Sequence, residues 1–171
     1  MASWGSSNYG NPCRECGFDW ATNLDESVAL VSRLRYTIRE LVSGSTGKER
    51  HPDLGWSVGA YVCHVGDNLR IWAERLVGVL ESGVTEVHGY DENELAQARH
   101  YDGIPLEAAQ WSLGRAVNDW CDAVGRSPRI GSVMVHPERG ALTLADVAVS
   151  NAHDGFHHCW DIKTILSGVA R

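Results

Sequence analysis

The sequence predicts an all-α protein, a four-helix bundle in which a small hairpin precedes the last helix. Four long segments repeat apolar residues at the three- and four-residue spacing of amphipathic helices. Start and stop signals flank these segments, and a long crossover joins two of them. A chain of 171 residues is long enough for one substantial core and too short for two comfortable domains. We therefore expect one bundle domain over residues 23–171, after an irregular arm over residues 1–22.

The first two long helices have clear boundaries in the sequence. Residues 23–44 place apolar side chains at helical spacing, with Asp25 and Glu26 in the first turn, where negative charge is favourable. Ser57 is a good N-cap for the second helix, which we expect to run to about Ser82. A glycine follows each of these helices, as is common at helix C-termini.

The second half of the chain predicts two more long helices and two minor elements. These are a short helix at 91–101, a third long helix at 105–125, a hairpin at 130–143 and a fourth long helix at 144–168. Thr143 is the expected N-cap of the last helix, with Asp146 as the acid of a capping box. Four long helices of this kind are typical of a bundle.

The composition excludes several classes of function. The net charge of −7 and the scattered Lys and Arg residues give no basic face for nucleic acid. No apolar run approaches the length of a membrane span, and the N-terminus lacks the basic and apolar regions of a signal peptide, so we expect a cytoplasmic protein. Five cysteines, an odd number, favour thiols or thiolate ligands over a full disulfide framework.

Histidines of the last helix indicate a candidate metal site. His153 and His157 lie four residues apart, so their imidazoles leave the same helix face and can converge on one ion. His158 lies about 100° further round the helix and is expected to be a neighbour, not a ligand. His64, in the middle of the second long helix, is the best candidate for a third ligand. The alternative is that these histidines are ordinary core residues.

Other side chains near these histidines are candidates for the pocket or for orienting the ligands. Asp161, one turn after His157, could hold an imidazole from behind. The remaining candidates are Tyr61, Asn68, Trp72 and Trp160. Ordinary helix packing is the alternative role for each of them.

Three stretches of the chain resemble the DinB/YfiT superfamily, in particular its actinobacterial type. They are "GWSVGAYVCHVGDNLRIWAERL", "YDENELAQARHYDGIPLEAAQWSLGRAV" and "HPERGALTLADVAVSNAHDGFHHCWDI". The resemblance implies a four-helix bundle with an up-down-down-up arrangement and a long crossover between the second and third long helices. It also implies a divalent metal ion held by three histidines, which by position are His64, His153 and His157. Three protein ligands leave a coordination position open, as in catalytic sites.

The resemblance further implies a metal-dependent enzyme with a small-molecule substrate. Related proteins include transferases and isomerases that use a low-molecular-weight thiol, such as mycothiol or bacillithiol, in detoxification or secondary metabolism. Hydrolysis is a further reaction for such a site. Zinc is the first expectation, with nickel or iron as alternatives, and a homodimer is implied by the resemblance alone. The rival hypotheses are a non-catalytic bundle that binds a metal or small molecule, and a bundle whose histidines are structural.

The N-terminal arm departs from the simplest family pattern, because it carries Cys13 and Cys16 in the motif Cys-x-x-Cys-Gly. Two thiolates in such a turn resemble half of a zinc knuckle, but no second motif supplies the other half. The pair could be a second metal site completed elsewhere, a redox dithiol, or a mobile pair of no special role. A fourth hypothesis is that the arm folds over the mouth of the bundle and brings its thiolates to the histidine-bound metal ion.

Overall fold

The computed structural model describes residues 4–127 and 132–168. Its long helices are α2 (Leu24–Leu41), α3 (Val58–Ser82), α5 (Leu106–Arg126) and α6 (Leu144–Ser167). The shorter elements are α1 (Ser6–Tyr9), α4 (Glu92–Ala98), the 3₁₀ helix η1 (Tyr101–Gly103), β1 (Ser132–His136) and β2 (Gly140–Thr143). The predicted four-helix bundle is confirmed, and each long helix lies close to its expected bounds.

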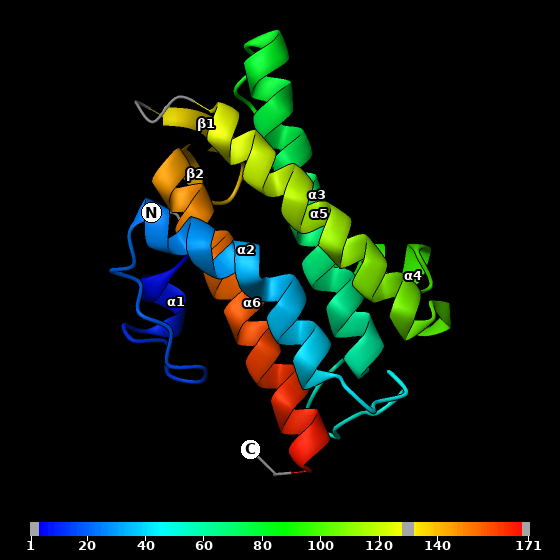
Figure 1. Cartoon of the computed structure of the whole chain (residues 1–171). Coiled ribbons are helices and arrows are strands. Elements are labelled where there is room, and N and C mark those ends of the chain that lie inside the picture. Colours follow the sequence, from blue (N-terminus) through cyan, green and yellow to red (C-terminus); the bar gives the residue numbers. More distant parts are fainter. Residues whose placement is uncertain (1–3, 128–131, 169–171) are drawn as a thin grey trace.

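The four long helices are arranged so that two neighbours in the sequence run parallel (Figure 1). α3 and α5 run in the same direction, and α2 and α6 run in the opposite direction (Figure 1). The chain must therefore cross the length of the bundle between α3 and α5, and residues 83–105 make this crossover. α5 packs against α3, and α6 packs against both α2 and α3. The last contact brings the histidine-bearing helices α3 and α6 side by side.

The small hairpin lies between α5 and α6 in the sequence. β1 and β2 pair in antiparallel register, with Val135 opposite Ala141 and His136 opposite Gly140. The crossover joins this sheet, because Val87 donates its backbone N–H to the Val135 carbonyl at 3.1 Å. The predicted hairpin is confirmed from residue 132 onward, and the first two residues of its expected range lie outside the described residues.

Side-chain caps fix where the functional helices begin. The Ser57 hydroxyl accepts the backbone N–H of Ala60 at 3.2 Å, as the sequence predicts. Thr143 caps α6, and the Asp146 carboxylate accepts the backbone N–H of Thr143 at 2.8 Å, so the expected capping box is formed. Each such cap stabilises the protein by about 1 kcal/mol.

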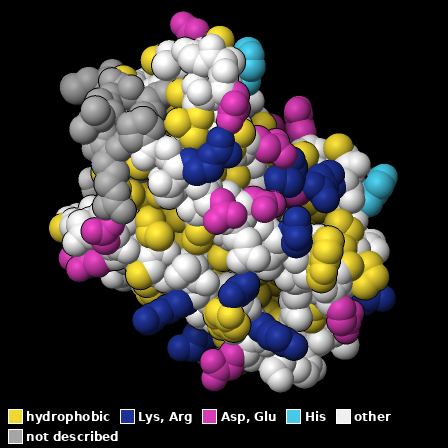
Figure 2. Space-filling view, turned by 45° about the horizontal axis from the view of Figure 1, so that its top comes forward, with side chains coloured by type: hydrophobic (Ala, Val, Ile, Leu, Met, Phe, Trp, Pro, Cys, Tyr) yellow, Lys and Arg dark blue, Asp and Glu magenta, His cyan; other side chains and the backbone are white. Residues whose placement is uncertain are grey.

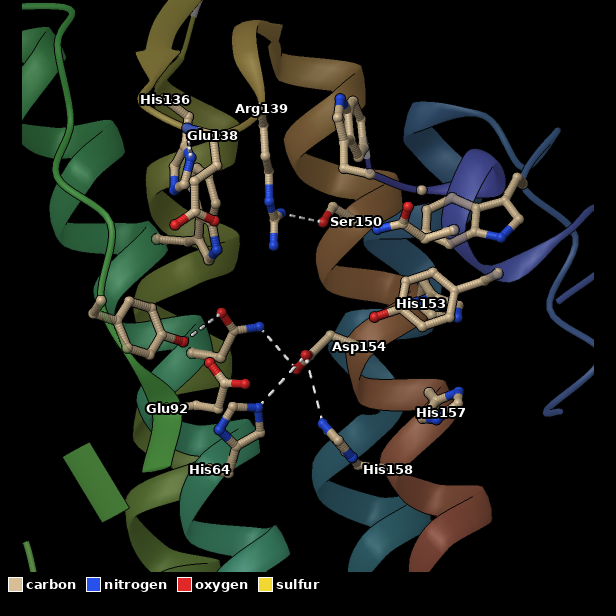
Figure 3. A pocket seen from close by; sticks show the side chains of 18 of the residues that line it. His64, Glu92, His136, Glu138, Arg139, Ser150, His153, Asp154, His157 and His158 are labelled. Carbon is tan, nitrogen blue, oxygen red and sulfur yellow. Dashed lines mark hydrogen bonds and ion pairs between the residues drawn. The ribbon is translucent and has the colours of Figure 1, made fainter. Parts of the chain in front are cut away.

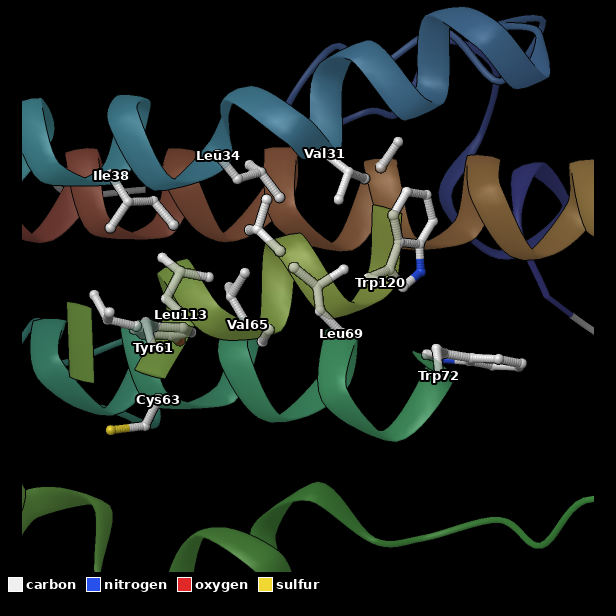
Figure 4. Close-up of a cluster of buried hydrophobic side chains, with 14 of the residues drawn as sticks. Val31, Leu34, Ile38, Tyr61, Cys63, Val65, Leu69, Trp72, Leu113 and Trp120 are labelled. Atoms are coloured by element: carbon white, nitrogen blue, oxygen red, sulfur yellow. The ribbon is translucent and has the colours of Figure 1, made fainter. Parts of the chain in front are cut away.

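The core lies between the four long helices (Figure 4). Val31 and Ile38 of α2 are fully buried there, and Leu69 of α3 is almost so. Trp120 of α5 is also fully buried, and its indole N–H donates to the Asn151 side chain of α6 at 2.8 Å. The largest buried side chain therefore keeps the hydrogen bond that a buried polar atom requires.

α2 and α6 approach each other closely at a glycine. A Cβ atom at Gly155 would overlap the side chain of Leu34, which is itself buried. Only glycine allows this contact without displacing core atoms, because the interior is close-packed. The contact fixes the rotation of α6 in the bundle, and with it the side chains that α6 turns toward α3.

The loop before α3 is organised by the carboxylate of Glu49. It accepts hydrogen bonds from the Ser45 hydroxyl at 2.6 Å and from the backbone N–H and hydroxyl of Thr46 at 2.8 and 2.9 Å. Partial burial alone would raise the pKa of Glu49, but these hydrogen bonds outweigh it and lower the pKa to about 2. The ionised carboxylate thus stabilises this loop.

We expect Glu49→Gln to destabilise the protein near pH 7 by about 1 kcal/mol, because the charge-assisted hydrogen bonds are lost. The folded pKa lies below the unfolded value, so this contribution is present above about pH 4.5 and is lost as the pH falls toward 2. Urea unfolding near pH 7 and near pH 3 measures the difference from the parent protein. Glu40→Gln, at an exposed site on α2, is the control. An effect of Glu49→Gln that is equal at both pH values would contradict this account.

The surface carries interspersed charges and some exposed aromatic rings. On the face shown in Figure 2, basic and acidic side chains lie beside one another. Trp111 of α5 and Tyr36 of α2 are 70% and 58% exposed and line the same groove. None of the helices in the described part of the chain is both long and apolar enough to cross a membrane.

Candidate metal centre and pocket

Helix α6 carries two pairs of candidate ligands on adjacent faces. His153 and His157 form one pair, and Asp154 and His158 form the other, and the members of each pair are four positions apart. One residue turns the helix by about 100°, so the two pairs point in different directions. Figure 3 shows Asp154 and His158 directed toward His64 of α3, while His153 and His157 lie on the side nearer the N-terminal arm.

The first group of donors joins α3 to α6. One donor atom from each of His64, Asp154 and His158 lies within 4.8 Å of the other two. Nε2 of His64 and Nε2 of His158 are each 3.6 Å from the same oxygen, Oδ1 of Asp154. His64 is buried and the other two are partly buried, so the group is largely shielded from bulk water.

These distances suit a bound cation better than direct hydrogen bonds. A separation of 3.6 Å is too long for a side-chain hydrogen bond. Two ligands that each lie about 2.1 Å from a tetrahedral ion are separated by about 3.4 Å. Two imidazoles with a carboxylate are a donor set of both zinc and non-haem iron sites, so these residues fit a divalent ion.

Hydrogen bonds from behind orient two of the donors. Asn68 donates its side-chain N–H to Oδ2 of Asp154 at 2.8 Å, which leaves Oδ1 facing the imidazoles. Tyr90 donates its hydroxyl to the Asn68 side-chain oxygen at 3.2 Å. Asp161 lies 2.8 Å from Nδ1 of His158, so that Nε2 of this ring faces Asp154. A carboxylate behind a histidine is typical of metal sites, because it fixes the tautomer and the ring orientation.

Opposite charges keep Asp154 ionised. Burial alone would raise the pKa of Asp154, but His158 and His64 outweigh burial and hold this pKa well below its usual range. Burial alone would likewise lower the pKa of His158, but Asp154 and Asp161 raise it to about 9. The protein by itself therefore forms an ion pair here, and a divalent cation would replace the proton on His158.

The second group of donors joins the N-terminal arm to α6. Sγ of Cys13, Sγ of Cys16 and one ring nitrogen each of His153 and His157 lie within 4.8 Å of one another. Cys13 Sγ is 3.9 Å from Nδ1 of His157, and both cysteines are free thiols. Burial of the Cys16 thiol raises its pKa to about 12, with a further contribution from Cys13. The closeness of their donor atoms makes these four residues a second candidate metal site, in which a bound cation would displace the thiol proton.

The structure divides the three histidines grouped by sequence between these two sites. His153 and His157 lie with the cysteines of the arm, whereas His64 lies with Asp154 and His158. His158, which helical spacing placed outside the site, has its ring centroid 4.8 Å from that of His64. The physical reason is the rotation of α6, since its close packing on α2 turns the Asp154 face toward α3.

A pocket of about 360 Å³ lies beside the first group (Figure 3). Residues of α3, of the crossover, of the hairpin, of α6 and of the N-terminal arm line it. The arm contributes the rings of Trp4, Tyr9 and Trp20. A cavity of this size holds a small molecule, not a macromolecule.

Two arginines place positive charge in this pocket. The guanidinium carbons of Arg75 in α3 and Arg139 in the hairpin lie 4.5 and 5.8 Å from the centre of a Trp72 ring. Arg139 also donates to the Ser150 hydroxyl at 2.8 Å. Neither arginine forms an ion pair with a carboxylate among the described residues, although other arginines of this part of the chain do. The two groups therefore remain available to an anionic part of a ligand.

The predicted pocket residues occupy different places around the site. Asn68 and Trp72 line the cavity. Tyr61 packs beside the first group, with its ring centroid 5.2 Å from that of His158. Trp160 packs beside the second group, and neither Tyr61 nor Trp160 is among the described residues that line the cavity.

Sequence reasoning did not consider Asp154 and set His158 aside as a neighbour, whereas the structure places both beside His64 as candidate donors. The signal was a second pair at helical spacing, Asp-x-x-x-His, which begins one residue after the pair of histidines. Carboxylate oxygens bind zinc as imidazole nitrogens do, so this spacing also predicts a pair of ligands. Tyr90 and Arg139 were also missed, because they lie in the crossover and the hairpin, where helical periodicity places no side chain.

The fold and the donor arrangement define a helical-bundle protein with a pocket lined by side chains that can coordinate a metal ion. The model of the DinB superfamily matches residues 22–162, and the chain belongs to this superfamily, as the sequence resemblance predicted. YfiT from Bacillus subtilis, described as a probable metal-dependent hydrolase with an unusual four-helix bundle topology, has a similar structure. The TM-score is 0.69 at 16% sequence identity, over 85% of this chain and 88% of YfiT, which shows a shared fold. No curated protein matches the sequence significantly.

Proposed function

We propose that this protein is a metal-dependent enzyme that acts on a small molecule in the pocket between α3 and α6. The observation that carries the proposal is the convergence of His64, Asp154 and His158 at the wall of this pocket. Three protein donors leave coordination positions open toward the cavity, whereas a structural site has four. The description of YfiT as a probable metal-dependent hydrolase supports the same class.

The donor set favours zinc, with nickel or iron as alternatives. When bound, the ion would acidify a water molecule or a thiol and so supply a nucleophile near neutral pH. Nε2 of His64, Oδ1 of Asp154 and Nε2 of His158 would hold it. Asn68 and Asp161 orient these donors in the protein itself, which reduces the loss of freedom on binding.

The proposed substrate carries an anionic group. Arg75 and Arg139 stack near the same Trp72 ring, and their planar guanidinium groups match a carboxylate or a phosphate. Rings of the arm, including Trp4 and Trp20, cover part of the pocket and reduce its contact with water. Charge interactions inside are stronger as a result.

A thiol-dependent transfer or isomerisation is the finer proposal. A low-molecular-weight thiol of the mycothiol or bacillithiol type would place its sulfur at the donor group and an anionic group near Arg75 and Arg139. Hydrolysis is the alternative reaction, in which water takes the place of the thiol. We propose a role in detoxification or secondary metabolism in the cytoplasm, and the homodimer stays a prediction.

Cobalt-loaded protein tests both the proposed metal site and the proposed binding of a thiol to it. Addition of a thiol such as glutathione should produce a new thiolate-to-cobalt charge-transfer band, because an open position accepts the sulfur. Addition of the thiol to His64→Ala/His158→Ala protein should produce no new band beyond any that the cysteines of the arm give by themselves, and this variant should hold one ion fewer. Arg75→Gln protein should need a higher thiol concentration.

The remaining outcomes distinguish a failed metal site, a hydrolase and a non-catalytic binding protein. Unchanged metal content in His64→Ala/His158→Ala protein would refute the pocket site. No thiol band, together with ester or amide hydrolysis that this double variant loses, would select the hydrolase. Saturable binding of small anions without turnover of any substrate would instead indicate the non-catalytic binding protein.

A further inference from the structure

The turn in the N-terminal arm brings two thiols to the face of α6 that carries His153 and His157. We propose that Cys13, Cys16, His153 and His157 bind a structural zinc ion, which fastens the arm to α6 and holds one wall of the pocket. This site uses other residues than the proposed catalytic one, and it does not depend on the reaction in the pocket.

The two cysteines lie in a tight turn that is closed by backbone hydrogen bonds. Gly17 donates its N–H to the Cys13 carbonyl at 2.9 Å, and Cys13 donates its N–H to the Phe18 carbonyl at 2.8 Å. Gly17 has a φ of +77°, a left-handed conformation that glycine adopts without strain. The turn therefore presents Cys13 and Cys16 to the same side without any disulfide between them.

The four donors lie within 4.8 Å of one another, close enough for one zinc ion to draw them into its coordination sphere. With zinc–sulfur and zinc–nitrogen bonds of about 2.3 and 2.1 Å, sulfur and nitrogen ligands lie about 3.6 Å apart. Cys13 Sγ and Nδ1 of His157 are 3.9 Å apart, so a movement of a few tenths of an ångström would complete the contact. Two cysteines with two histidines form a closed structural set, in which no position is left for water.

Carboxylates near one nitrogen of the His157 ring orient its other nitrogen toward this cluster. Its Nδ1 faces Cys13, while its Nε2 lies 3.4 Å from a carboxylate oxygen of Glu15. Glu15 belongs to the same turn as the cysteines, and Asp161 approaches Nε2 of the same ring at 4.0 Å. Carboxylates beside one nitrogen of a histidine fix the tautomer that leaves the other nitrogen able to ligate.

His153 is a buried imidazole that the protein does not satisfy. It is 5% exposed, and its Nε2 has no hydrogen-bond partner among the described residues. Its neighbours are aromatic, since the ring centroids of Trp20, Tyr9 and Phe18 lie 4.3, 4.7 and 5.4 Å away. A buried polar ring of this kind is unfavourable without a polar partner, and a zinc ion would be one.

The same arm lines the pocket, so the cluster affects the proposed active site. Trp4, Tyr9 and Trp20 contribute to the cavity wall, yet α1 is four residues long and none of these four is buried. So short a segment has no core of its own, and cross-links to the bundle decide whether it stays in place. A zinc ion between the turn and α6 would close a loop that contains most of the chain. It would thereby hold the arm, and this wall of the pocket, in place.

A redox dithiol is the competing interpretation of the two cysteines. An exchange-active thiol needs access to a partner sulfur. Cys13 is only 2% exposed and has two imidazoles beside it within the cluster. These surroundings suit a metal ligand better than a thiol that exchanges disulfides.

Metal analysis of the full-length protein and of two double variants tests the proposal. Zinc-loaded parent protein should hold about two ions per chain, and Cys13→Ser/Cys16→Ser and His64→Ala/His158→Ala protein should each hold about one. Cys121→Ser, at a free thiol outside the cluster, is the control and should keep both ions. Parental zinc content in the cysteine variant would overturn the proposal.

The two sites can fail separately. If only the pocket site fails, the parent should hold about one ion, which the cysteine variant loses and the pocket variant keeps. If only the arm site fails, the single ion should be lost with His64→Ala/His158→Ala and kept by the cysteine variant.

Two further measurements keep the test decisive if the cysteine variant folds poorly. Cobalt bound to His64→Ala/His158→Ala protein should show thiolate-to-cobalt charge transfer and the strong visible bands of tetrahedral coordination. Removal of zinc from the parent by a chelator should speed amide exchange in residues 4–22 by about tenfold or more, while α5 is unaffected. No charge-transfer band, or unchanged exchange in the arm, would contradict the proposal.

Discussion

Asp154→Ala protein is expected to bind the pocket metal ion at least about 100-fold more weakly than the parent protein. Substitution of residues that only support ligands already weakens binding by about 10- to 100-fold, and Asp154 is a proposed ligand itself. It is also the carboxylate of the first donor group, with one oxygen 3.6 Å from both imidazoles. Competition with a chromophoric chelator measures the affinity, and the Cys13→Ser/Cys16→Ser background removes the second ion.

Glu138→Gln is the matched control for this prediction. Glu138 is another carboxylate that lines the pocket, but it does not belong to either donor group. We expect its substitution to leave zinc affinity within about twofold, since it contributes only a distant charge. Equal affinities of Asp154→Ala and parent protein would show that the ion binds elsewhere.

The second large effect is expected at Asp67, which ties the crossover to α3. This buried carboxylate accepts the Tyr101 hydroxyl at 2.6 Å and a guanidinium N–H of Arg99 at 2.5 Å. Asp67→Ala should lower the free energy of unfolding by about 3 kcal/mol, because it removes one partner from a buried charged network. Urea unfolding of the parent and variant proteins near pH 7 measures the difference.

Glu74→Ala is the control for this prediction, on the same helix. Glu74 pairs with Arg70 at 2.6 Å, but its side chain is 63% exposed. Exposed pairs contribute about 1 kcal/mol or less, so the control should be close to the parent protein. Similar losses for Asp67→Ala and Glu74→Ala would mean that the buried network does not hold the crossover.

The elements of the fold were predictable because they depend on local chemistry. Apolar spacing indicated each long helix, and the caps at Ser57 and Thr143 lie where the sequence placed them. Hairpin residues such as Val135 showed the β-branched character of strands. These signals act over a few residues, so no knowledge of distant contacts was needed.

The composition of the site was predictable only in part. Sequence spacing indicated one pair of candidate donors four residues apart on α6, together with His64 of α3, which lies beside this helix in the structure. It could not choose between the pair that begins at His153 and the pair that begins at Asp154. The two pairs are offset by one position along the helix. A rotation of the helix by about 100° would therefore point one pair where the other now points.

The sequence by itself determined that this protein is a helical bundle with imidazoles, carboxylates and thiols at metal-ligand spacing. Tertiary structure alone decided which of them meet. The contact of Gly155 with Leu34 sets the rotation of α6, which directs Asp154 toward α3 and His153 toward the arm. Periodicity defines the faces of a helix, but the packing of its neighbours defines what each face touches.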